Sequence, residues 1–77
     1  MEQLSIRLRE LRAEKGLRQK DVASDLGIST TCYAGYEQSY HEPDLKTLCK
    51  IARYFGVSTD YLLGLEDEAG NRPHIKP

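Results

Sequence analysis

Residues 17–38 read LRQKDVASDLGISTTCYAGYEQ, and this stretch decides the fold. Its apolar residues lie on one side of a short helix that we expect over residues 18–26, and Gly27 ends that helix. The hydroxyl of Ser29 can then cap the free backbone N–H groups of a second helix, expected over residues 30–38. The stretch therefore predicts two short helices joined by a tight turn.

Two helices joined by a short turn that contains glycine form a helix-turn-helix, whose second helix can enter the DNA major groove, about 12 Å wide. At about 100° per residue, small side chains fall on one arc of that second helix and bulky ones pack inward from the other. The outward arc holds Thr30, Thr31, Ala34 and Gly35, and the inward arc holds Cys32, Tyr33, Tyr36 and Glu37.

The outward arc has a functional and a neutral interpretation. Thr30 and Thr31 can exchange hydrogen bonds with a base edge, and their methyl groups, like that of Ala34, can contact a thymine methyl. Gly35 would let DNA approach the helix backbone closely. The alternative is that the threonines are ordinary solvated residues and that Gly35 reflects drift at an exposed position.

The rest of the chain adds three helices around this pair. Apolar spacing predicts a helix over residues 4–15, a second over 45–55 after an Asp-capped loop, and a short last helix through 61–63. We therefore expect an all-α domain of five helices over residues 1–65. The remaining residues, 66–77, are poor in aliphatic side chains and are expected to form a flexible tail.

Composition favours one compact domain, and its net charge favours neither an anionic nor a cationic partner strongly. The chain has 77 residues, a formal net charge of −1, 39% hydrophobic residues and 30% charged residues. Basic residues are concentrated in the first 20 positions, whereas positions 21–45 contain acids and no Lys or Arg. An anionic partner must therefore meet a selected face of the domain.

Several classes of function are disfavoured by what the sequence lacks. It has no glycine-rich phosphate loop, nucleophile elbow or paired metal-binding histidines, so we expect no catalysis. Cys32 and Cys49 have no Cys/His cluster around them, which disfavours a metal and favours reduced thiols. The absence of a long apolar run and of a signal peptide predicts a cytoplasmic location without membrane contact. No cofactor or small-molecule ligand is indicated.

The ordered set of motifs resembles the phage-repressor-like (Cro/repressor-type, XRE) family of helix-turn-helix transcriptional regulators. The motifs are residues 17–29, Tyr36-Glu37, Glu42-Pro43 and Gly56-Val57-Ser58. The resemblance extends from about Leu4 to Leu65 without a gap. It implies a five-helix, lambda-repressor-like DNA-binding domain with its helix-turn-helix at about residues 18–38.

The resemblance also implies a set of DNA-binding residues. It places Gln19 near the DNA backbone, and Arg18 and Lys20 beside it are suited to phosphate, although solubility remains the simpler role for Lys20. The groove-facing positions are Ser29, Thr30, Thr31, Ala34 and Gly35, and Tyr40 and His41 lie in the loop that follows the backbone. The same resemblance brings Arg12 and Glu37 together as a structural ion pair.

Two functions remain open at this stage. The first is a transcriptional regulator, expected to be a repressor, that binds a double-stranded DNA operator as a homodimer. Its dimer surface is expected in the C-terminal part, where Tyr61, Leu62, Leu63 and Leu65 cannot all point inward from one short helix. The second is a protein-interaction module, such as an antitoxin, or a regulator with little base-specific binding. The uncharged outward arc and the acidic middle segment favour this alternative.

Overall fold

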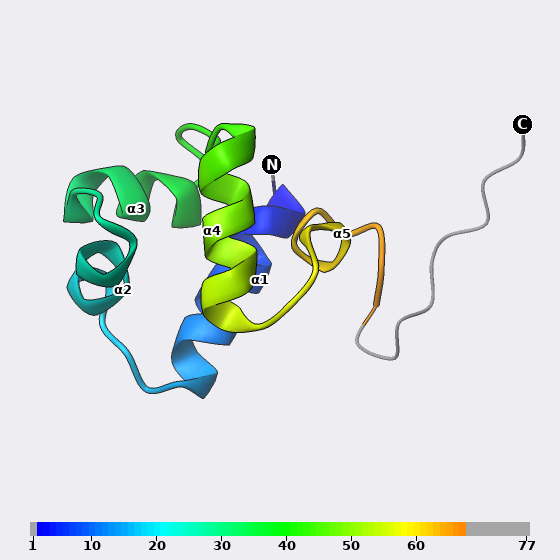
Figure 1. Ribbon diagram of the computed structural model, residues 1–77, viewed down its shortest axis with the longest axis horizontal. Helices are drawn as coiled ribbons and strands as arrows, with labels where there is room; N and C mark the ends of the chain where they lie inside the picture. The colour runs from blue at the N-terminus through cyan, green and yellow to red at the C-terminus, as the bar shows by residue number, and fades with distance from the viewer. Residues whose placement is uncertain (1, 68–77) are drawn as a thin grey trace, which may run out of the picture.

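The computed structural model describes residues 2–67 and contains five helices, as the sequence predicts (Figure 1). No strand occurs within these residues, so the all-α prediction is confirmed. None of the helices in this range is long and apolar enough to cross a membrane. In chain order the helices are α1 (Glu2–Glu14), α2 (Gln19–Leu26), α3 (Thr30–Glu37), α4 (Leu45–Phe55) and α5 (Thr59–Leu62).

The helix ends follow local chemistry. The side chain of Asp44 accepts a hydrogen bond from the backbone N–H of Thr47 at 2.8 Å, and this cap begins α4. The helix ends at Gly56, whose φ of 69° places it in the left-handed region that favours glycine. Gly27, with a φ of 75°, ends α2 in the same way and reverses the chain toward α3.

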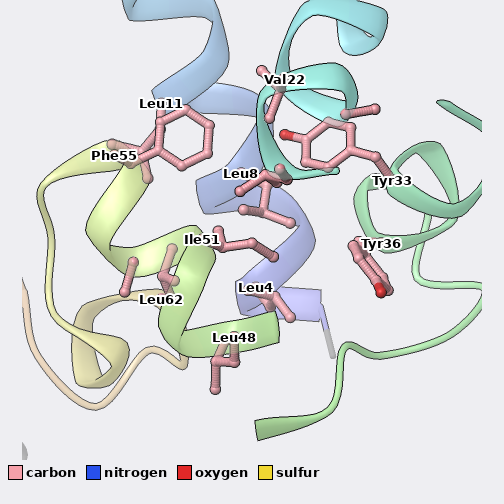
Figure 2. Close-up of a cluster of buried hydrophobic side chains, with 13 residues drawn as sticks. Leu4, Leu8, Leu11, Val22, Tyr33, Tyr36, Leu48, Ile51, Phe55 and Leu62 are labelled. Atoms are coloured by element: carbon pink, nitrogen blue, oxygen red, sulfur yellow. The ribbon is translucent and has the colours of Figure 1, made fainter. Parts of the chain in front are cut away.

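Every helix contributes to one hydrophobic core. Figure 2 shows leucines of α1 pointing toward Ile51 and Phe55 of α4, with Val22 and Tyr33 closing the core from α2 and α3. Tyr33 has no exposed surface, which fixes the rotation of α3 about its own axis. The buried apolar residues are Leu4, Leu8, Leu11, Val22, Ala23, Leu26, Tyr33, Tyr36, Leu48, Ile51, Ala52, Phe55 and Leu62.

The C-terminal turn is fastened to α1. The guanidinium of Arg7 lies 4.0 Å from the ring centroid of Tyr61 and donates hydrogen bonds to the carbonyls of Tyr61 at 2.6 Å and Glu66 at 2.7 Å. The Ser58 hydroxyl donates to the Glu66 carboxylate at 2.8 Å. Glu66 is therefore held against α1 and the beginning of α5, and the boundary of the expected tail at residue 66 stays a prediction. Residues 68–77 of the expected tail lie outside the described residues.

Gln3 of α1 lies directly against Gly64. A Cβ built on Gly64 would come within 2.8 Å of the Gln3 Cγ, so the two segments are in close contact. The φ of Gly64 is 80°, which again favours glycine at this position. The beginning of α1 and the end of α5 are therefore neighbours in space.

Candidate nucleic-acid interface

The first turn of α3 presents the exposed side chains of Thr30 and Thr31 to solvent. Ser29 caps this helix, because its hydroxyl oxygen accepts a hydrogen bond from the backbone N–H of Cys32 at 3.0 Å. Ala34 is half-buried, whereas Tyr33 and Tyr36 are buried in the core. The two threonines therefore lie outward as the helical projection predicts, and the tyrosines lie inward.

Gly35 does not lie on an open surface, which corrects the expectation for this residue. It is buried, because the imidazole of His41 folds back from the following loop and covers it. A Cβ built on Gly35 would be 2.3 Å from the His41 Nε2, and that nitrogen lies 2.9 Å from the carbonyl oxygen of Cys32. A helical projection cannot show this, since the covering group comes from outside the helix.

The N-terminal end of α2 carries Arg18 in a local ion pair. The carboxylate of Asp21 accepts hydrogen bonds from the backbone N–H of Arg18 at 3.0 Å and from its Nε at 3.2 Å. These bonds, the backbone one first, hold the pKa of Asp21 below its usual value. The Arg18 side chain is still 72% exposed, and Lys20 beside it is exposed too. Both cations are therefore accessible to an anion.

A buried ion pair joins α1 to α3. The Arg12 guanidinium donates to both carboxylate oxygens of Glu37, from Nε at 2.6 Å and from Nη2 at 3.0 Å, and from Nη1 to the carbonyl of Leu17 at 2.9 Å. Glu37 is only 1% exposed. The expected pair between Arg12 and Glu37 is thus present as a two-bond contact.

Gln19 extends this pair to α2. Its Nε2 donates to Glu37 Oε1 at 3.1 Å, so at least one of its amide N–H groups is used inside the protein. Burial alone would raise the pKa of Glu37, but hydrogen bonds led by Arg12 outweigh it and leave that pKa below its ordinary value. One carboxylate therefore links α1, α2 and α3 and sets their relative positions.

Further contacts that were not predicted hold the helix-turn-helix from its other sides. The Arg9 Nη1 donates to the carbonyl of Glu37 at 2.6 Å, where a cation meets the negative end of the α3 dipole. Lys50 donates to the carbonyl of Leu26 at 2.8 Å, at the corresponding end of α2. For the contact between Arg9 and the Glu37 carbonyl, the sequence did contain a signal: Arg9 precedes Arg12 by three residues, a spacing that places two side chains on the same side of a helix.

The loop between α3 and α4 contains the remaining expected DNA contacts. Tyr40 is 81% exposed, which leaves its ring available to a partner. His41 is also exposed on one side, while its other side lies against α3. Tyr40 therefore faces solvent, whereas His41 extends the surface of α3.

Comparison with known proteins identifies this arrangement. A family model described as helix-turn-helix matches residues 8–62. The HTH-type transcriptional regulator ImmR of Bacillus subtilis is 42% identical over 64 residues, which are 83% of this chain and 50% of ImmR. The chain spans about half the length of the curated relatives it matches, 50% and 53% for two of them.

Solved structures show the same fold. A transcriptional regulator from Listeria innocua superposes with a TM-score of 0.76 at 32% identity, covering 84% of this chain and 61% of that one. The P22 c2 repressor protein, in complex with a synthetic operator, gives a TM-score of 0.73 at 27% identity over 77% of this chain and 89% of the repressor. The chain therefore belongs to the phage-repressor-like family of helix-turn-helix proteins.

Proposed function

We propose that this chain is a sequence-specific DNA-binding transcriptional regulator that acts as a repressor. The observation that carries the proposal is a helix-turn-helix whose α3 exposes Thr30 and Thr31, in a fold shared with a repressor in complex with a synthetic operator. The buried Arg12–Glu37 pair supports it, because this pair holds α3 in one orientation before any partner arrives. A preorganised helix loses less freedom on binding.

In this function α3 lies in the major groove and the flanking segments contact the DNA backbone. Hydroxyl and methyl groups at the beginning of α3 read base edges, and the exposed cations at the beginning of α2 contact phosphates. We assign base contacts to Ser29, Thr30, Thr31 and Ala34, and backbone contacts to Arg18, Gln19, Lys20 and Tyr40. His41 contacts the DNA from the loop after α3, with its ring against that helix. Gly35 lies within the same surface beneath His41.

The low net charge of the domain supports a proposal that two copies of the chain bind one DNA site. A net charge of −1 supplies little general attraction to DNA, so useful affinity and specificity need two reading helices on one symmetric site. We propose a homodimer through the C-terminal part, where Leu65 is 45% exposed and Tyr61 and Leu63 are half-buried, while Leu62 completes the core. Half-sites would lie about 34 to 36 Å apart, one DNA turn from centre to centre.

Selection of bound sequences from a random duplex pool tests the function directly. We expect enrichment of a two-fold symmetric site, and tighter binding of that site than of a scrambled duplex of equal length and composition in a mobility-shift titration. Sedimentation of the complex should show two protein chains on each site. A single chain per site at saturation would contradict the dimer.

A protein-interaction module is the competing function, and one observation favours it. The α3 sequence, TTCYAGYE, contains neither Lys nor Arg, so the reading helix itself offers no cation to DNA. Affinity that is uniform across all duplexes, or absent at physiological salt, would favour this alternative over the repressor.

A further inference from the structure

We propose that His41 supplies the side chain that α3 lacks at Gly35 and thereby sets base preference at one position of the bound DNA. The inference rests on the proposed function and assigns a specificity-determining role to a loop residue. Gly35 is four residues after Thr31, one helical turn further along α3. With glycine there, α3 itself offers no side chain at that position.

The imidazole of His41 occupies the space that a side chain at position 35 would take. Three of its atoms, Nε2, Cδ2 and Cε1, lie 2.3, 2.7 and 3.1 Å from where a Gly35 Cβ would stand. Its Nε2 is 2.9 Å from the Cys32 carbonyl oxygen, and its ring centroid is 4.9 Å from that of Tyr36, tilted by 46°. All of these contacts are with α3, so the ring moves with that helix.

The contact with Cys32 determines which hydrogen-bonding group the ring offers to a partner. A backbone carbonyl only accepts hydrogen bonds, so the Nε2 of His41 must carry the proton that it donates. In the neutral ring Nδ1 is then an acceptor. The three ring atoms nearest Gly35 are Nε2, Cδ2 and Cε1, so Nδ1 is not one of the atoms that cover the glycine, and on this exposed side chain the proposal assigns it the contact with DNA.

An acceptor at this place has defined partners in the major groove. The exocyclic amino groups of cytosine and adenine are donors there, whereas the edge of guanine presents acceptors at N7 and O6. We therefore expect His41 to favour a base pair that presents an amino group to it and to disfavour guanine at the same position.

The geometry of the ring can be tested on the free protein. Nitrogen-15 chemical shifts of the imidazole should show the Nε2–H tautomer in the wild type. They should show a mixture of tautomers in Gly35→Ala, because the new methyl group displaces the ring. A mixture of tautomers in the wild-type protein would overturn the inference without touching the proposed function.

Base preference is tested by selecting duplexes with the wild type and four variants. His41→Ala, His41→Phe and Gly35→Ala should each lose about tenfold of the discrimination at one and the same base position, the loss of a single base contact. Tyr40→Ala is the matched control from the neighbouring loop position: it removes a proposed backbone contact, so it should weaken binding to every duplex alike and leave the base preference unchanged. Circular dichroism confirms that each variant is folded, and His41→Phe keeps a ring against Tyr36 if His41→Ala disturbs the loop.

The outcomes separate this inference from the function on which it rests. If the His41 variants bind every duplex more weakly by the same factor, His41 is a brace for the loop and the inference is overturned while the proposed function stands. If the wild type selects no sequence at all, both are overturned.

Discussion

Replacing Arg12 with alanine should strongly destabilise the domain, because Glu37 would remain buried without its cation. The pair has two hydrogen bonds, at 2.6 and 3.0 Å, and the Glu37 side chain is only 2% exposed. Removing one partner of a buried pair costs about 3 to 5 kcal/mol. The Arg12 side chain is 23% exposed, which places the expected loss toward the lower end of that range.

Thermal and urea unfolding measure this loss. For a domain of this size each kcal/mol lowers the melting temperature by roughly 4 to 8 °C, so Arg12→Ala should melt at least about 12 °C below the wild type. Arg18→Ala is the matched control, since it removes an arginine from an exposed pair with Asp21 and should change the melting temperature little.

The pH dependence gives this prediction a distinctive sign. In the wild type the pKa of Glu37 is lowered, so its contribution to stability is present above the unfolded-state pKa and is lost as pH falls through the folded-state pKa. Arg12→Ala removes the hydrogen bond and the charge that oppose burial most strongly, so the pKa of Glu37 should rise relative to the wild type and acidification should relieve the buried charge. The stability difference between the two proteins should therefore shrink between about pH 7 and pH 4.

An equal melting temperature for Arg12→Ala and the wild type would refute the reasoning. So would a stability difference that stays constant between neutral and acidic pH, because the loss would then come from packing of the arginine stem rather than from the buried carboxylate.

Four further substitutions have defined outcomes. Thr31→Ala should weaken binding to the selected duplex by roughly 1 to 3 kcal/mol and relax base preference, whereas Arg18→Ala should weaken all duplexes alike and reduce the salt slope by about 1. Equal losses of Thr31→Ala on selected and random DNA in mobility shifts would exclude direct readout. Ser29→Ala removes the cap of α3 and should lower the free energy of unfolding in urea by about 1 kcal/mol; an unchanged value would mean that water satisfies the Cys32 N–H equally well. Leu65→Glu should abolish the dimer in sedimentation while far-UV circular dichroism stays the same, and a persisting dimer would place the interface elsewhere.

Features encoded within one helix were predictable from the sequence. Gly27 and Gly56 end their helices where expected, and Ser29 caps α3 as its position suggests. Such features depend on backbone conformations and hydrogen bonds within a few residues, which a linear pattern contains. The inward placement of Tyr33 followed from the period of the helix for the same reason.

Contacts between segments that are brought together only by the fold were not predictable in the same way. His41 covers Gly35 because the loop after α3 folds back, and helical periodicity contains no information on that path. The backbone of Glu66 is held by Arg7, which is distant in sequence, and composition contains no sign of that contact. The Arg12–Glu37 pair required the family resemblance, since the spacing of charged residues alone does not identify partners on different helices.

The contact between Gln3 and Gly64 has a consequence for the order in which the helices can be connected. Because these two residues touch, a short glycine-rich linker could join the end of α5 to the beginning of α1 without crossing the core. New chain ends could then be opened at the exposed turn of Lys15 and Gly16, so that α1 becomes the last helix instead of the first. The five helices would keep their neighbours in such a circular permutant, and α2 and α3 would remain consecutive.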